Sequence, residues 1–125
     1  MYQKCIQKTK VKSMKLSEII SALDVQNVNK VPIKDDEEVI NGYTCDLLSQ
    51  VLAGAKSNSI WVTVQSHLNI IGVAVMTGIS AVIICDGHEV PDNVIEKADE
   101  EQVALFKSTE NAFQLSGKLY ECGIR

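Results

Sequence analysis

The stretch from 60 to 84, IWVTVQSHLNIIGVAVMTGISAVII, decides the fold expected for this chain. It opens with a β-branched and aromatic run at 60–64 (IWVTV) and closes with a continuous apolar run at 81–84 (AVII). Such runs are typical of parallel strands that are covered on both faces. Residues 67–76 between them are apolar almost all round, which predicts a helix that is buried or lies at a subunit interface. Together the three segments predict a right-handed βαβ unit.

Alternating helices and strands are also predicted downstream of this unit. Pro91 and Asp92 open a helix, 103–106 forms the next strand, and a last helix starts at Thr109 or Asn111. The pattern therefore predicts a single α/β domain with a mostly parallel sheet and packed helices.

Upstream, the pattern predicts shorter elements. Residues 15–23 have the spacing of an amphipathic helix, and 26–33 contains a strand that a proline stops. A short strand at 39–40 is broken by the dipeptide 41–42 (NG), which suits positive φ. Asp46 is the expected N-cap of the helix that follows.

The charge of the chain is unevenly distributed. The net charge is −4, but the first thirteen residues carry four lysines and no acid, which leaves 8 basic and 16 acidic residues in the rest. A body with this acidic surplus repels phosphate backbones, so we expect no nucleic-acid binding. We interpret residues 1–13 as a disordered basic leader and 14–125 as the folded domain; the alternative is a nucleic-acid-binding arm.

Composition also bears on location and cofactors. The longest apolar run, 70–76, is far shorter than the about 20 residues that span a membrane, and no signal peptide is recognisable. The four cysteines lie about forty residues apart without a Cys-x-x-Cys pair, so we expect reduced thiols in a cytoplasmic protein. Cys85, Asp86 and His88 lack the spacing of a recognised metal site, and we expect neither metal nor cofactor.

The motifs of common enzymes are missing from this sequence. Gly117-Lys118 resembles the end of a phosphate-binding P-loop, but Leu119 stands where Ser or Thr is needed, and the segment lies within a predicted helix. We therefore predict that the protein is not an enzyme.

Polar residues follow the predicted strands, where open parallel sheets bind their ligands. Two of these groups precede helices, whose free amides and dipole favour an anion, so we predict a phosphate-bearing or nucleotide-like ligand. In the alternative interpretation, the serine, threonine and histidine side chains cap helices or pack. The predicted site consists of Asn41, Gly42, Gln65, Ser66, His67, Asn69, Asp86, His88, Lys107, Ser108 and Thr109.

Two segments resemble DRTGG domains. Residues 41–49 (NGYTCDLLS) are similar to the family's Gly-Gly-Tyr followed two residues on by Asp-Leu-Leu-Ser, and 61–70 (WVTVQSHLNI) to its tryptophan-containing strand followed by Gln-x-His. The resemblance covers roughly residues 15–122. The name-giving motif departs from the family here: Asp36 stands for its Asp, but an acid, Glu37 or Glu38, stands where Arg is expected.

The glycine pair of that motif is also changed. Asn41 replaces the first glycine, while Gly42 keeps the second. Because Asn tolerates positive φ better than other residues with a side chain, we expect this change to be mild.

The resemblance implies a regulatory domain with the fold of the N-terminal domain of HPr kinase/phosphorylase. Such domains occur beside CBS pairs in some pyrophosphatases, in long phosphate acetyltransferases, and alone. The kinase's catalytic domain has no counterpart here. Stand-alone members accompany iron-only hydrogenase and electron-transfer genes, which implies an accessory role.

We therefore expect a non-catalytic, ligand-binding regulatory module that forms a homodimer through the apolar helix at 67–76. One alternative is a protein-interaction subunit, for example of a hydrogenase, without a small-molecule site. The other is a small phosphotransferase.

Overall fold

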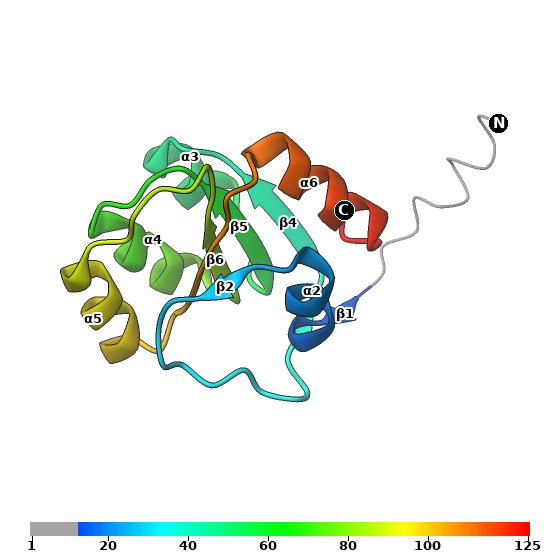
Figure 1. The fold of residues 1–125 in the computed structure, drawn as a ribbon, viewed down its shortest axis with the longest axis horizontal. Coiled ribbons are helices and arrows are strands. Elements are labelled where there is room, and N and C mark those ends of the chain that lie inside the picture. The colour runs from blue at the N-terminus through cyan, green and yellow to red at the C-terminus, as the bar shows by residue number, and fades with distance from the viewer. Residues whose placement is uncertain (1–12) are drawn as a thin grey trace, which may run out of the picture.

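The structure, a computed structural model, describes residues 13–125, and the predicted basic leader lies outside them except for Ser13. Four parallel strands lie side by side in chain order and make up all of a five-stranded sheet except one edge strand (Figure 1). They are β4 (Asn41–Thr44), β5 (Ser59–Thr63), β6 (Ala81–Ile84) and β7 (Ala104–Lys107). The short β2 (Gln26–Asn27) joins antiparallel beside β7. The predicted α/β class with a mostly parallel sheet is confirmed.

Three helices connect successive parallel strands and cover one face of the sheet. They are α3 (Leu48–Gly54), α4 (Asn69–Thr77) and α5 (Asp92–Glu100). Right-handed crossovers that all proceed in one direction across a sheet place their helices on the same side. Trp61 of β5, Val82 of β6 and Leu105 of β7 pack into this helical layer, where all three are fully buried.

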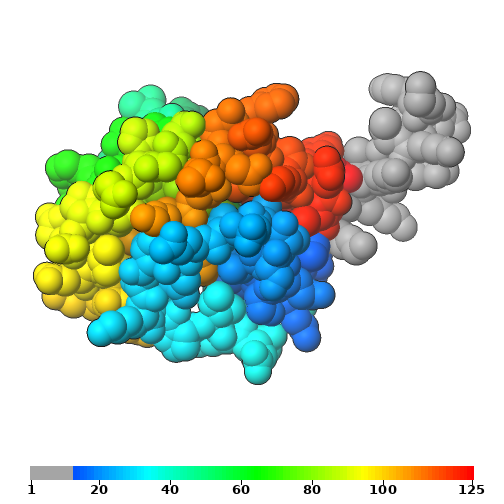
Figure 2. All heavy atoms as spheres, viewed as in Figure 1, coloured from blue at the N-terminus to red at the C-terminus, as the bar shows by residue number. Residues whose placement is uncertain are grey.

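The opposite face is covered by α2 (Leu16–Leu23) and α6 (Ala112–Glu121), which come from the two ends of the described chain. These helices lie side by side in Figure 2, α2 in blue and α6 in orange to red. Because successive side chains of a strand point to opposite faces, Ile60 and Val62 of β5 face this layer while Trp61 faces the other. A separate two-stranded ladder joins β1 (Met14–Lys15) to β3 (Glu38–Val39).

The strand predicted within 26–33 is only two residues long, and the side chain of Asn29 extends its pairing. The Asn29 amide Nδ2 donates to the carbonyl of Val103 at 2.7 Å, and its Oδ1 accepts from the amide N–H of Leu105 at 3.1 Å. A side chain thus provides the hydrogen bonds that another residue of strand would otherwise supply.

The turn predicted at 41–42 is wrong, because these residues begin β4. Asn41 pairs with Ser59 and Gly42 with Ile60 at the amino end of the parallel ladder. Neither residue has positive φ, so the conformational reason given for this asparagine does not hold. A Cβ on Gly42 would lie 3.5 Å from Cγ2 of Ile124, an ordinary contact.

Two of the predicted helix caps are also wrong. Helix α3 has Leu47 at its N-cap, and Asp46 instead binds the loop after β5. Helix α4 begins at Asn69 rather than at 67 and has Leu68 at its N-cap, so Ser66 is not a cap. The last helix has Asn111, the second of its two predicted starting residues, at its N-cap.

At that start, Asn111 forms a capping box with Gln114. None of the helices in residues 13–125 has the length and apolar composition that crossing a lipid bilayer requires.

Candidate functional site

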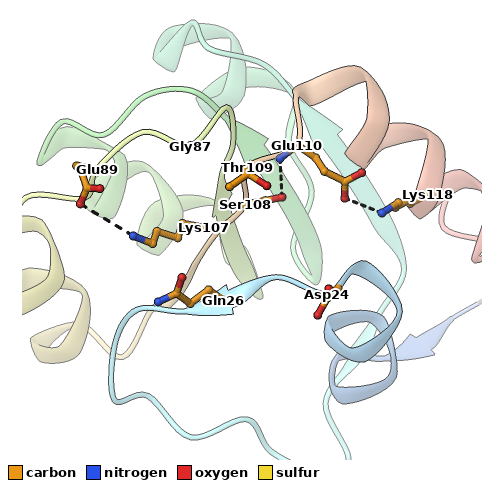
Figure 3. A pocket seen from close by; sticks show the side chains of 9 residues that line it. All are labelled: Asp24, Gln26, Gly87, Glu89, Lys107, Ser108, Thr109, Glu110 and Lys118. Carbon is orange, nitrogen blue, oxygen red and sulfur yellow. Dashed lines mark hydrogen bonds and ion pairs between the residues drawn. The ribbon is translucent and has the colours of Figure 1, made fainter.

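The carboxyl ends of β5, β6 and β7 surround two neighbouring hollows, which the turn at 86–88 separates. We call the first, of about 490 Å³, the Lys107 hollow, and Figure 3 shows its lining: Asp24, Gln26, Gly87, Glu89, Lys107, Ser108, Thr109, Glu110 and Lys118. We call the second, of about 580 Å³, the His67 hollow; it is lined by Val64, Gln65, Ser66, His67, Leu68, His88, Pro91, Asn93 and Val94.

The turn between the hollows has a tightly fixed backbone. Asp86 and Gly87 both have left-handed φ, of 64° and 68°. The Asp86 N–H donates to the carbonyl of Glu110 at 2.8 Å, and the Gly87 N–H donates to the carbonyl of Ser108 at 2.8 Å. The turn after β6 is thereby held to the segment that follows β7.

Charged side chains of both signs line the Lys107 hollow. Lys107 Nζ lies 4.0 Å from Oε2 of Glu89, a side chain that is 93% exposed, whereas Lys118 Nζ lies 2.6 Å from Oε1 of Glu110. In Figure 3 these two pairs lie on opposite sides, with Gln26 and Asp24 across from them. An exposed ion pair at the limit of contact stabilises little, so Lys107 can exchange Glu89 for another anion at low cost.

The loop after β5 is anchored by Asp46. Oδ1 of Asp46 accepts hydrogen bonds from the buried Thr63 hydroxyl and from the Val64 N–H, both at 2.9 Å. The Gln65 N–H donates to Thr63 Oγ1 at 3.1 Å, and its Nε2 donates to the carbonyl of Asp46 at 3.0 Å. Gln65 is therefore fixed through both its backbone and its side chain.

His67 receives a hydrogen bond that defines the tautomer of its neutral ring. The backbone N–H of Asn69 donates to Nδ1 of His67 at 3.2 Å. Because Nδ1 uses its lone pair as an acceptor, the neutral imidazole carries its proton on Nε2. The ring consequently offers an N–H donor at Nε2.

The helix amides expected to bind an anion are satisfied locally. In α4, the amides of Asn69 and Ile70 bond to His67, and in α6 the capping box uses the amides of Asn111 and Gln114. The positive charge available at this edge therefore comes from lysine side chains rather than from helix starts.

Burial makes Cys85, the residue that directly follows β6, unsuitable as a nucleophile. Desolvation raises the pKa of its thiol, with the nearby carboxylates of Asp86 and Asp46 adding to the effect. No group of three or more His, Cys, Asp or Glu side chains within residues 13–125 is arranged to hold a metal ion.

The structure divides the predicted site residues among four places: the two hollows, positions beside them, and the amino end of the strands. Gln65, Ser66, His67 and His88 line the His67 hollow, while Lys107, Ser108 and Thr109 line the Lys107 hollow. Asp86 and Asn69 lie beside the hollows without lining them.

Asn41 and Gly42 lie at the opposite, amino end of the strands, so the structure does not bring them to the other predicted residues. Sequence reasoning missed several lining residues: Asp24, Gln26, Glu89, Asn93, Glu110 and Lys118. Gln26 belongs to the antiparallel edge strand β2 and Asp24 is the C-cap of α2, and no local pattern indicates that these segments reach the hollow.

A second surface, which we call the α3–α4 face, is formed by uncharged helices. Neither 47–55 nor 57–85 contains an Asp, Glu, Lys or Arg residue, although 22% of the whole chain is charged. Its exposed apolar side chains, with their exposed fractions, are Leu47 (63%), Leu52 (44%), Leu68 (38%), Val75 (47%) and Met76 (74%). Because α3 and α4 pack against each other, these side chains lie on neighbouring helices, and apolar residues gathered in this way are typical of interaction surfaces.

Comparisons with known proteins agree with the fold. The family model of the DRTGG domain matches residues 18–122. A similar solved structure is that of the CBS and DRTGG domains of the regulatory region of Clostridium perfringens pyrophosphatase, complexed with its activator diadenosine tetraphosphate. The TM-score is 0.69 at 13% identity, over 90% of this chain and 47% of that chain, so this chain matches about half of that one. No curated protein matches significantly in sequence.

Proposed function

The chain belongs to the DRTGG domain family, and from this we propose that it is a non-catalytic regulatory module that binds an anionic metabolite at the carboxyl edge of its sheet. The observation that carries the proposal is Lys107, a cation at the end of a parallel strand. Its ion-pair partner, Glu89, is held only weakly. An incoming phosphate or carboxylate displaces the exposed Glu89 side chain from Lys107, in a hollow whose other charged lining residues are Asp24, Glu110 and Lys118. The similar regulatory region, which was solved with a bound nucleotide activator, supports a role in binding.

The chemistry of the edge supports binding rather than catalysis. Neither His67 nor His88 receives a hydrogen bond from a serine, threonine or cysteine side chain within residues 13–125. The thiol of Cys85 is buried and favoured in its protonated form. A nucleophile activated by a neighbouring base, as covalent catalysis requires, is not assembled from these groups.

Thermal unfolding tests the anion site. The purified protein is heated with a panel of nucleotides, phosphorylated metabolites and dicarboxylates. A ligand at one hundred times its Kd adds about 2.7 kcal/mol, which corresponds to a rise in Tm of roughly 10 °C for a domain of this size. Lys107→Gln should abolish the shift, while Lys97→Gln on α5 should retain it. Absence of a shift with every compound would overturn the proposal.

We further propose that two copies of the chain associate through the α3–α4 face. A two-fold axis brings the same surface patch of both copies together, so in an acidic chain the uncharged face can meet its own copy without repulsion between like charges. Gly72 on α4 has nothing within 4 Å of the position of a Cβ, so a second helix can approach its backbone closely.

Sedimentation equilibrium at micromolar concentration tests this dimer. The wild-type chain should be dimeric, and Met76→Glu should make it monomeric because it places two carboxylates in an apolar contact. Phe113→Glu on α6 is the matched control, since Phe113 is 87% exposed but lies away from the α3–α4 face. A monomeric wild-type chain would reject the dimer and favour instead the accessory-subunit function, in which a different protein covers this face.

A further inference from the structure

The His67 hollow differs from the Lys107 hollow in that none of its lining residues is Asp, Glu, Lys or Arg. Its apolar lining residues are Val64, Leu68, Pro91 and Val94. A small anion would gain little from such walls, because apolar side chains cannot replace its hydration. The hollow fits an uncharged group that buries an apolar surface.

The polar groups in the same hollow form a matched donor and acceptor. Gln65 uses Nε2 to donate to the Asp46 carbonyl, so its Oε1 is the atom that remains to accept a hydrogen bond. His67, two residues further on, offers N–H at Nε2 because Nδ1 is occupied by the Asn69 amide. An uncharged ring with apolar faces and with donors and acceptors along its edge, such as a nucleobase, satisfies both requirements at once.

The two hollows adjoin the same turn, the one that follows β6. Gly87 lines the Lys107 hollow and His88, the next residue, lines the His67 hollow. We infer that the ligand is a nucleotide whose base lies in the His67 hollow and whose phosphate lies at Lys107. This inference rests on the proposed function, because the phosphate of the nucleotide would occupy the anion site at Lys107.

Amide chemical-shift mapping by NMR separates the two halves. The probes are the four common ribonucleoside 5′-monophosphates, ribose 5-phosphate and the four nucleosides. A monophosphate should shift the amides of 65–68 and of 107–109, a nucleoside only the first group, and ribose 5-phosphate only the second. The preferred monophosphate should bind about tenfold or more tightly than ribose 5-phosphate.

Variants at His67 test the base contact. His67→Ala should weaken monophosphate binding roughly five- to tenfold while leaving the affinity for ribose 5-phosphate unchanged. His67→Gln retains an N–H donor and should recover most of the loss. Asn69→Ala is the matched control, because the contact of Asn69 with His67 comes from its backbone.

Two different failures are distinguishable. If ribose 5-phosphate binds as tightly as every monophosphate and 65–68 do not respond, the base site is rejected and the anion site stands. If none of the probes binds, the nucleotide inference is overturned. The anion site then falls with it only if the thermal panel of phosphorylated metabolites and dicarboxylates also gives no shift.

Discussion

Replacing Asp46 with alanine should lower the free energy of unfolding by about 3 kcal/mol. Oδ1 of Asp46 accepts two hydrogen bonds, and one donor is the hydroxyl of Thr63, which is fully buried. A hydrogen bond to a charged acceptor contributes about 1.5–3 kcal/mol. Because Asp46 itself is exposed, we take the lower end of this range for each bond.

Asp46→Asn separates the charge from the acceptor. The amide oxygen can still accept both bonds, but neutral bonds are roughly half as strong as charged ones, so the expected loss is about 1.5 kcal/mol. At about 4 °C per kcal/mol, Tm should fall by about 12 °C for the alanine variant and about 6 °C for the asparagine variant.

The assay is urea unfolding together with thermal unfolding, with Asp35→Ala as the control. Asp35 is exposed and accepts no hydrogen bond among residues 13–125, so its loss should stay within about 0.5 kcal/mol. Equal losses for Asp46→Ala and Asp46→Asn would refute the role of the shared oxygen acceptor. A loss for Asp46→Ala no larger than that of the control would refute the whole network.

Three further predictions concern backbone, cap and thiol. Gly42→Ala should leave stability unchanged or raise it by up to about 1 kcal/mol. Gly78→Ala should lower the free energy of unfolding by about 1–2 kcal/mol, since φ is 72° at Gly78. If urea unfolding gave equal losses for Gly42→Ala and Gly78→Ala, the extended conformation of Gly42 in β4 would be contradicted. Asn111→Ala should lower the free energy of unfolding by about 1 kcal/mol, measured by calorimetry. An unchanged Tm would mean that the capping box does not stabilise the protein. Burial raises the pKa of Cys85, so iodoacetamide should modify Cys45 in the native protein and Cys85 only after unfolding. Because its pKa is raised on folding, the stability that Cys85 contributes is complete below the pKa of an unfolded thiol and is lost as pH rises. The difference in unfolding free energy between wild type and Cys85→Ala should therefore shrink above about pH 8.5. A difference that stays constant up to about pH 10 would disprove the raised pKa of Cys85 in the folded protein.

The centre of the sheet could be predicted from sequence because burial there leaves a simple pattern. Strands covered on both faces are rich in continuous apolar residues, and both 60–62 (IWV) in β5 and the whole of β6 (AVII) fit that pattern. The edge strands have no such signal. In β4 burial alternates, and its first two residues are a dipeptide that is typical of turns. In β2 the pairing is extended by the side chain of Asn29, which no periodicity indicates.

The candidate site could be predicted only to the extent that the order of strands along the chain determines where the residues that follow them lie. Residues that follow parallel strands meet at one edge, so Gln65, His67 and Lys107 all lie at the carboxyl edge of the sheet, although Lys107 lines a different hollow from the other two. That this edge binds a ligand stays a prediction. Asp46 was misinterpreted as a cap because its position before an apolar helix fits that role equally well. The family resemblance, which the match over residues 18–122 confirms, includes this aspartate without indicating what it binds.

The second face of the sheet is covered by helices from both ends of the described chain, and this has a consequence for partly folded states. If α6 undocks while the layer of α3, α4 and α5 stays in place, the side of the sheet that contains Ile60, Val62 and Phe106 keeps only one of its two helices, α2. A chain in this state exposes a row of apolar residues and is vulnerable to aggregation and to capture by chaperones. Docking of α6 closes that face.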